Sequence, residues 1–303
     1  MTIRKQALSA IAAFFAGLFL FCTLLPAGPA AATEAGNAEI RLTMIPHRSA
    51  LGNMKAYGKL IAALEKASGY TIRWVGAKTY QEVIDNLRGK KADIGYVGAF
   101  AYIEAQDDFG VRLIARTLDK KRRAFYQSLI ITRSDSAIKS LRDLKGKVFA
   151  FTDPGSTSGF LFPMVALTKT GLRLEDFSDV KYVKRHANSI MAVVNRQADA
   201  GAMSSTAREK VDIDFGQIRI LWESDPIYRG PWIAAKEMPD ESFYRIQKAL
   251  ITISDDDNAA EIFKELGTKG FVLGKDSDYD NVREVYRLMN SSRVKNETRS
   301  LQR

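Results

Sequence analysis

Three consecutive hydroxyl side chains between two glycines form the segment whose residue types are best suited to bind an anion. In order, the segment reads Gly155, Ser156, Thr157, Ser158 and Gly159. Each hydroxyl can donate one hydrogen bond, and each glycine lets the backbone approach a ligand closely. An apolar run typical of a buried strand precedes it at 147–151, and a run typical of a helix follows. Because the first N–H groups of a helix lack intrahelical partners and carry partial positive charge, we expect a site for a small tetrahedral oxyanion.

Two other interpretations of this segment have to be weighed. A serine or threonine before a helix is often only a structural N-cap, and this alternative stays open. A nucleotide-binding P-loop is excluded, because that motif requires a lysine after its second glycine and Phe160 stands there instead.

His186 is a further candidate ligand residue. It stands where an apolar helical pattern begins, and anions gather at helix starts. His47, in a polar loop after the first predicted strand, is a weaker candidate on the opposite wall of the site. A catalytic interpretation would pair Ser156 or Ser158 with His186 as nucleophile and base. Neither a G-x-S-x-G motif nor an acid in a recognisable position accompanies them, so we do not expect an enzyme.

Residues 1–32 have the pattern of a secretory signal peptide. Arg4 and Lys5 precede an apolar run, 7–25, and an A-x-A site ends the segment. An uncleaved membrane anchor is the alternative, because the run approaches the length that spans a bilayer. Cleavage would remove Cys22, the only cysteine, and leave a chain without a disulfide or a thiolate metal site. We therefore expect a periplasmic protein that holds no metal and no cofactor.

The chain is basic, with a formal net charge of +10 that becomes +8 when Arg4 and Lys5 leave with the signal peptide. A basic surface steers anionic ligands toward a protein. No nucleic-acid recognition motif is present, so we do not expect nucleic acid as a partner. The basic run 120–123 is more typical of a solvated turn, although it could also draw an anion toward the site.

Apolar periodicity predicts alternating strands and helices in two stretches of the chain. The first stretch has predicted strands at 39–45, 70–75, 92–98 and 111–117, with predicted helices at 57–68, 80–87 and 99–106. The second has predicted strands at 126–133, 147–151, 180–183, 200–203 and 218–222, with predicted helices at 160–170 and from His186 onward. This alternation is typical of an α/β architecture with mixed, mostly parallel sheets covered by helices.

The order of these elements predicts two lobes. We expect lobe 1 at 38–127 and 229–290, lobe 2 at 128–228, and a polar tail at 291–303. Two crossings, near 125–130 and 223–232, would serve as the hinges of a clam-shell. Ligands of open α/β sheets bind beyond the carboxyl ends of the strands, so the segment 155–159 should face the cleft between the lobes.

Several of these pieces resemble the phosphate-, phosphite- and phosphonate-binding proteins of bacterial ABC transporters. The most specific parts are the pattern D-P-x-S-T-S-G-F at 153–160 and the downstream His186. Further matching pieces, in order and spacing from about residue 40 to 275, lie at 93–98, 125–131, 192–201 and 221–224. The resemblance implies a type II periplasmic binding fold and a monomer that carries a small anion to an ABC permease of the inner membrane. A ligand-binding component of a membrane sensor is the alternative.

The resemblance also implies roles for single residues. It assigns the oxyanion oxygens to Ser156, Thr157, Ser158 and His186, and adds Gly159, Tyr126 and Tyr96 to the site. The chain departs from the pattern where an aromatic residue is expected directly before the glycine at a strand end. Val97 stands at that position and Tyr96 one step earlier, which turns a strand side chain to the opposite face.

A second departure concerns the acidic residues with which some members of the family bind aminoalkyl phosphonates. The aligned positions here are Thr206 and Gly230, and neither carries a carboxylate. We therefore predict a ligand without a cationic amine, namely phosphate, phosphite or a simple alkylphosphonate.

Overall fold

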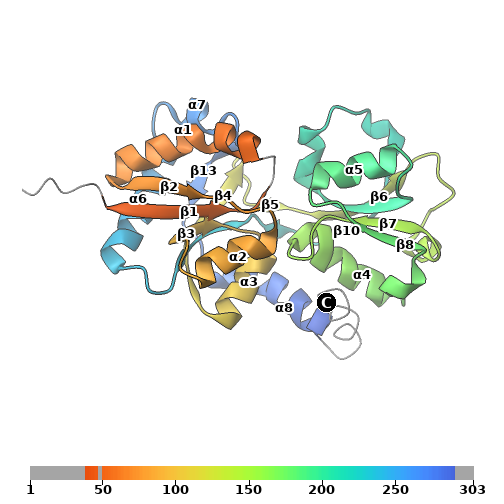
Figure 1. Cartoon of the computed structure of the whole chain (residues 1–303). Helices are drawn as coiled ribbons and strands as arrows, with labels where there is room; N and C mark the ends of the chain where they lie inside the picture. Colours follow the sequence, from red (N-terminus) through yellow and green to blue (C-terminus); the bar gives the residue numbers. More distant parts are fainter. Residues whose placement is uncertain (1–37, 47–49, 291–303) are drawn as a thin grey trace, which may run out of the picture. The chain divides into compact units, whose positions relative to one another are not determined.

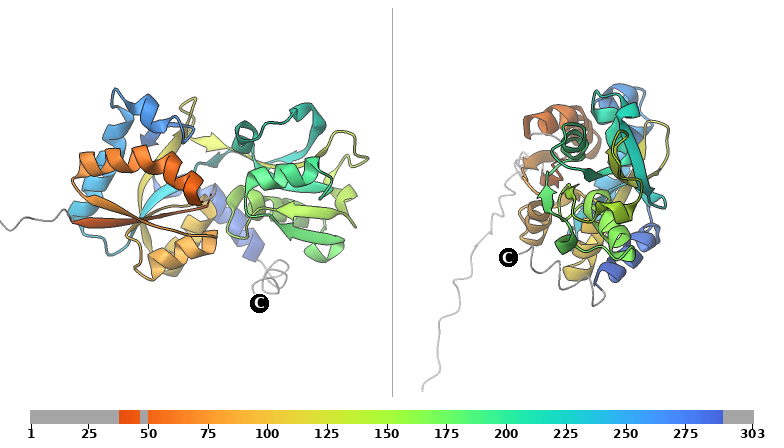
Figure 2. Two further views of the ribbon diagram at one scale, coloured as in Figure 1. Left: turned by 45° about the horizontal axis from the view of Figure 1, so that its top comes forward. Right: turned by 90° about the vertical axis from the view of Figure 1, so that its right-hand side faces the viewer.

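The structure is a computed structural model that describes residues 38–46 and 50–290 (Figure 1). The predicted signal peptide 1–32, His47 and the predicted polar tail 291–303 lie outside the described residues. In the described part, two large sheets carry helices on both of their faces, as Figure 2 shows from two further directions.

The first sheet has the strand order β13-β4-β12-β3-β1-β2. Its strands are β1 (Glu39–Met44), β2 (Thr71–Val75), β3 (Ile94–Tyr96), β4 (Val111–Asp119), β12 (Pro231–Ala235) and β13 (Thr268–Val272). The helices around it are α1 (Ala50–Ser68), α2 (Tyr80–Arg88), α3 (Ala99–Asp108), α6 (Asp240–Ser254), α7 (Ala259–Phe263) and α8 (Asp280–Asn290). On one face, Leu42 of β1 packs in a core with Leu60 of α1 and Ile246 of α6. On the other face, Val83 of α2 and Ile103 of α3 belong to a second core, which gives the sheet its apolar layers on both sides.

The second sheet has the strand order β10-β6-β9-β7-β8. Its strands are β6 (Ser128–Arg133), β7 (Val148–Phe151), β8 (Asp179–Tyr182), β9 (Ala200–Ser204) and β10 (Ile218–Glu223). Two helices cover it, α4 (Phe162–Lys169) and α5 (His186–Val194). Ile190 and Val193 of α5 pack against Ile131 of β6, as the apolar spacing of this helix predicts.

The chain crosses between the sheets at two short strands that pair with each other. β5 (Phe125–Tyr126) and β11 (Ile227–Tyr228) form an antiparallel ladder in which Tyr126 pairs with Ile227. The predicted single strand 126–133 is therefore interrupted. Gln127 leaves the ladder and donates its backbone N–H to the Ser205 hydroxyl at 3.0 Å. Because of this break, β5 belongs to the crossing between the two sheets and β6 belongs to the second sheet.

The expectation of mostly parallel sheets is wrong in the part of the chain that the structure describes. Parallel ladders join β1 to β2 and β3, and β7 to β8 and β9. Antiparallel ladders are at least as frequent, joining β12 to β3 and β4, β13 to β4, and β6 to β9 and β10. Strands that follow a crossing, such as β6 and β12, enter their sheet directly and not through a strand–helix–strand unit, so no crossover helix imposes a parallel direction.

Among the described residues, we find no helix that combines the length and the apolar character needed to cross a bilayer.

Candidate functional site

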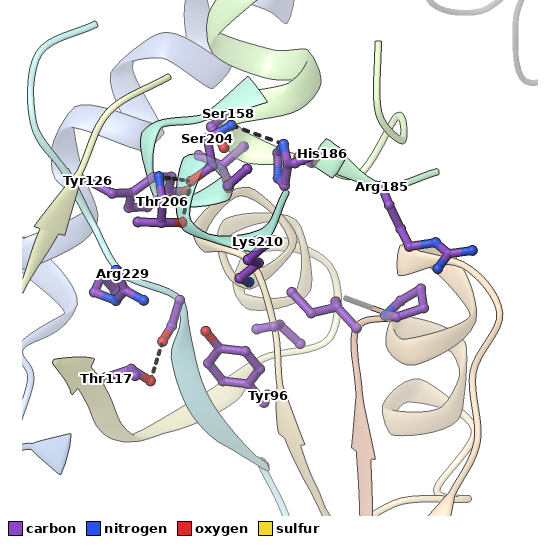
Figure 3. Close-up of a pocket in the computed structure, with 18 of the residues that line it drawn as sticks. Tyr96, Thr117, Tyr126, Ser158, Arg185, His186, Ser204, Thr206, Lys210 and Arg229 are labelled. Atoms are coloured by element: carbon purple, nitrogen blue, oxygen red, sulfur yellow. Dashed lines mark hydrogen bonds between the residues drawn. The ribbon is translucent and has the colours of Figure 1, made fainter. Parts of the chain in front are cut away.

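A cavity of about 590 Å³ lies where the strand ends of both sheets converge (Figure 3). Residues that follow β1, β3, β7, β8 and β9 line it, together with the return segment that contains Arg229 and Gly230. Loops at the carboxyl ends of strands are the usual ligand sites of α/β folds. Six of the seven predicted site residues line this cavity: Tyr96, Tyr126, Ser156, Thr157, Ser158 and His186.

The hydroxyl segment begins one continuous helical run. Ser156 is the N-cap, and its Oγ accepts a hydrogen bond of 3.0 Å from the N–H of Gly159. A π-helical turn, Thr157–Leu161, follows and leads directly into α4. The helix therefore starts three residues earlier than the sequence pattern 160–170 predicts. The earlier start places the amides of Thr157 and Ser158 in the first turn, where N–H groups have no intrahelical acceptor.

Pro163 ends the π-helical bonding of this turn. In π-helical bonding the carbonyl of Ser158 would accept from residue 163, but proline has no N–H. The hydroxyl of Ser128, on the neighbouring strand β6, donates to that carbonyl at 2.8 Å instead. The turn is thus fixed by a side chain of the sheet on which it packs.

The hydroxyls of the segment are almost fully buried yet line the cavity. Ser156, Thr157 and Ser158 are each 2% exposed. Ser156 Oγ accepts from the Gly159 N–H, and Thr157 Oγ1 accepts from the Phe100 N–H at 2.9 Å. A hydroxyl oxygen that accepts a hydrogen bond still carries its own proton. Ser156 is also hydrogen-bonded to Tyr80 and Thr157 to Tyr126, so a ligand oxygen would compete with these tyrosines for the two protons.

Thr157 also connects the two sheets. Its partner Phe100 lies in the first turn of α3, whose N-cap is Gly98. A Cβ added to Gly98 would lie 3.3 Å from Thr157 Oγ1, so a glycine at this position allows the close approach. The N-terminal ends of two helical runs therefore meet at the cavity, and both contribute partial positive charge to it.

His186 opens α5 and is a neutral donor. The backbone N–H of Ser204 donates to His186 Nδ1 at 3.1 Å, as Figure 3 shows. Burial, and next the positive charge of Lys210, lower the pKa of His186 to about 3. A neutral imidazole whose Nδ1 accepts must carry its proton on Nε2. His186 therefore offers an uncharged N–H to the cavity.

Two tyrosines add further neutral donors. Burial raises the pKa of Tyr126 to about 12, against hydrogen bonds to Ser158 and Thr157 that lower it. Burial likewise raises the pKa of Tyr96, and Arg229 and a hydrogen bond to Thr117 act in the opposite direction. The Tyr96 hydroxyl points toward the middle of the cavity in Figure 3, so a residue of β3 reaches the site although Val97 occupies the position before the glycine.

Gly159 is the one predicted site residue that does not line the cavity. A Cβ at this position would lie 1.8 Å from Thr152 Oγ1, far closer than atoms can approach. The glycine thus allows the helical turn to pack on the end of β7, and its N–H serves Ser156 Oγ and not a ligand.

The wall opposite His186 carries a cation that the sequence interpretation missed. Arg229 is half-buried, and its Nε is buried without a hydrogen-bond partner among the described residues. Its backbone is held on both sides, because its N–H donates to the Ala124 carbonyl at 2.8 Å and its carbonyl accepts from the Tyr279 hydroxyl at 3.0 Å. The cavity therefore contains a positively charged side chain in addition to its neutral hydrogen-bond donors. The sequence did contain a signal for this residue, because an arginine stands between Tyr228 and Gly230 in the segment predicted to cross back from lobe 2 to lobe 1.

Tyr80 and Phe100 are two further residues that the sequence interpretation did not assign to the site. Tyr80 begins α2, lines the cavity and is 5% exposed. Its place in the apolar pattern of the helix indicated a core residue and gave no indication of a role in the site. Phe100 contributes a backbone N–H, which no side-chain pattern can indicate.

Thr206 and Gly230, the positions at which a carboxylate would be expected for an amine ligand, both line the cavity. A Cβ at Gly230 would lie 2.3 Å from the Val97 carbonyl oxygen, so no side chain fits there. Glu209 is the one acidic residue among the described residues that line this cavity. It is exposed and pairs with Lys120 at 3.3 Å.

The basic run 120–123 lies beside this ion pair. Lys120 and Arg123 line a second cavity, and Arg123 Nε also pairs with Asp119 Oδ2 at 2.7 Å. Both cations thus have an acidic partner close by.

The described residues contain no cluster of three or more histidine, cysteine, aspartate or glutamate side chains that could hold a metal ion.

Comparisons of sequence and structure lead to one family. The family model described as "ABC transporter, phosphonate, periplasmic substrate-binding protein" matches residues 42–279. The chain is 29% identical to the phosphate-import protein PhnD of Mycolicibacterium smegmatis, over 88% of this chain and 91% of that protein. It is 25% identical to the phosphonates-binding periplasmic protein of Escherichia coli, over 89% of this chain and 82% of that protein.

Among solved structures, PhnD1 from Prochlorococcus marinus in complex with methylphosphonate is similar, with a TM-score of 0.74 at 18% identity. The match covers 83% of this chain and 98% of that chain. This likeness confirms the predicted fold class, a two-lobe type II periplasmic binding fold.

Proposed function

Since the chain belongs to the family of periplasmic substrate-binding proteins of phosphonate ABC transporters, we propose that it captures phosphate, phosphite or a simple alkylphosphonate without a cationic amine. Family membership makes the protein a periplasmic, non-catalytic component that binds a small ligand and serves a membrane permease. The proposal concerns the identity of that ligand and the residues that hold it.

One observation carries the proposal. The segment Ser156–Ser158 presents its hydroxyls to the same cavity as His186, whose free proton lies on Nε2. A phosphonate head offers several acceptor oxygens and no donor when fully ionised. Hydroxyls, first-turn amides and a neutral imidazole are all donors, so each can bond an oxygen of the ligand without a proton transfer.

The charges of the cavity favour the absence of an amine. Arg229 and Lys210 line it, whereas a side chain at Gly230 is sterically excluded. A cationic amine would meet repulsion on this side and find only the paired Glu209 as a counter-ion. An anion without a positively charged substituent therefore suits the site.

Closure of two lobes is part of the proposed mechanism. We assign 38–127 and 229–290 to lobe 1 and 128–228 to lobe 2, with β5 and β11 as the hinge. The hydrogen bond between the Phe100 N–H and Thr157 Oγ1 joins these lobes at the cavity. A ligand that contacts both lobes stabilises the closed state selectively. Small-angle scattering should show a smaller radius of gyration with ligand than without it.

Titration calorimetry against phosphate, phosphite, methylphosphonate and 2-aminoethylphosphonate tests the ligand class, with sulfate as a control for simple anion binding. We expect micromolar or tighter binding of at least one of the first three ligands. Tight binding of 2-aminoethylphosphonate alone would refute the proposal.

We also propose how the protein is exported and that it is a monomer. We assign residues 1–32 to a cleaved signal peptide, so N-terminal sequencing of the exported protein should begin at Thr33. We propose a monomer that has no nucleic-acid partner, and light scattering of the purified protein should give the mass of a single chain.

A further inference from the structure

The main cavity is much larger than a phosphonate head requires. Its volume is about 590 Å³. Methylphosphonate has five heavy atoms, which occupy about 150 Å³ even if each is given the liquid volume of one water, roughly 30 Å³. Most of the cavity is therefore available to a substituent or to water.

The extra room continues on the side of Arg229. A second cavity of about 500 Å³ borders the first, and both are lined by Tyr126, Thr206, Arg229 and Leu266. Arg229 lies with Tyr96 and Thr117 on the side of the main cavity away from Ser158 and His186 (Figure 3). A substituent on an oxyanion held by the hydroxyl segment would extend toward this wall.

The guanidinium of Arg229 is placed to meet that substituent. Burial raises the pKa of both Tyr96 and Tyr126, and the positive charge of Arg229 acts against burial in each case, so the guanidinium lies near both hydroxyls. The Nε of Arg229 is buried and has no hydrogen-bond partner among the described residues. Because Nε has almost no accessible surface, an acidic group of the ligand would meet the terminal nitrogens of the guanidinium, which lines both cavities.

We propose that Arg229 is a specificity-determining residue that binds a second acidic group on the ligand, and that the substrate class extends to phosphonocarboxylates. This inference rests on the proposed function, because it takes the phosphonate head to be held by Ser156–Ser158 and His186. A guanidinium binds a carboxylate through paired, charge-assisted hydrogen bonds, which a neutral group of the same shape cannot form.

Titration calorimetry with phosphonoacetate, phosphonoacetamide and methylphosphonate tests the inference. Phosphonoacetate and phosphonoacetamide have the same size and differ in the charge of the substituent. We expect phosphonoacetate to bind about tenfold tighter or more, the range of a hydrogen bond to a charged group. The Arg229→Gln variant should reduce that ratio to about one, and Arg229→Lys should retain part of it.

The Arg123→Gln variant serves as the charge-matched control. Arg123 lines only the second cavity and is neutralised by Asp119, so its loss should leave the ratio between the two ligands unchanged. An equal reduction by Arg123→Gln would mean that overall charge, and not Arg229, sets the preference, which would overturn the inference.

The remaining outcomes separate this inference from the proposed function. If methylphosphonate or phosphate binds while phosphonoacetate is no tighter than phosphonoacetamide, the inference fails and the proposed function stands. If Arg229→Gln weakens methylphosphonate and phosphonoacetate equally, Arg229 holds the phosphonate itself, and the inference also fails. If none of these ligands binds, the proposed function fails and the inference fails with it.

Discussion

The backbone N–H of Ser204 donates a hydrogen bond of 3.1 Å to Nδ1 of His186. Ser204 ends β9 and His186 begins α5, so the contact joins a strand end to a helix start. It fixes the tautomer of the imidazole, because an accepting Nδ1 leaves the proton of the neutral ring on Nε2. The donor that His186 offers is thus determined by the backbone of another element.

The His186→Ala variant should weaken binding of the tightest ligand. The loss of one ligand hydrogen bond at a buried site costs about 1–3 kcal/mol, or roughly 5- to 150-fold in Kd. His186→Gln keeps an amide donor and should recover part of that affinity. Calorimetric titration of the three proteins measures both effects, and an unchanged Kd for the alanine variant would remove His186 from the site.

The stability of the ligand-free protein should fall on acidification partly through His186. Burial and Lys210 lower the pKa of His186 to about 3, from an ordinary value of 6.5. Below the ordinary value the unfolded chain takes up the proton while the folded protein does not, so the free energy of unfolding decreases until the pH reaches about 3. The loss from this group can reach at most about 1.4 kcal/mol for each pH unit.

The matched variant for this pH effect is His186→Gln, which cannot titrate. Its free energy of unfolding should decline less than that of the unaltered protein between about pH 7 and about pH 4. Urea denaturation at several pH values gives both curves. Groups other than His186 contribute to both proteins alike, so parallel curves would show that His186 is not held neutral by the fold.

The Ser158→Ala variant should weaken ligand binding by about 1–3 kcal/mol, because it removes a hydroxyl that lines the cavity. Tyr126→Phe is the comparison variant, since it removes a hydroxyl that also lines the cavity and is hydrogen-bonded to Ser158 and Thr157. We expect the tyrosine variant to cost less than the serine variant. The opposite order, measured by calorimetry, would mean that Tyr126 and not Ser158 is the main donor to the ligand.

Gly159→Ala should destabilise the fold. The new Cβ would lie 1.8 Å from Thr152 Oγ1, and Thr152 is 1% exposed and cannot move aside. Overpacking of this kind costs about 1–3 kcal/mol. Gly58→Ala is the control, because Gly58 lies on the exposed face of α1 with no atom within 4 Å of its added Cβ.

In the control, alanine should stabilise the helix by about 0.5–1 kcal/mol. Thermal melts of the two variants should therefore move in opposite directions from the unaltered protein. A Gly159→Ala protein that melts no lower than the unaltered one would contradict the packing role of this glycine.

The sequence alone predicted much of the local structure. The starts of α2 at Tyr80 and α5 at His186 match the periodicity of their apolar residues, because each helix buries one face. The segment Ser156–Ser158 was also identified from local spacing, because three hydroxyls between two glycines directly precede an apolar helical run. Strand directions were less predictable, because β12 pairs with β3 and β4 only after the chain has built another sheet.

The sequence by itself determined the order of strands and helices and the donors of the hydroxyl segment, because both depend on spacing within a few residues. Only the tertiary structure decided that Arg229 faces this segment, that Tyr96 lines the cavity and that Gly159 packs on Thr152. Each of these facts depends on segments distant in the sequence meeting at one place. Such meetings are set by the packing of whole sheets and helices, for which the local pattern of residue types carries no direct signal.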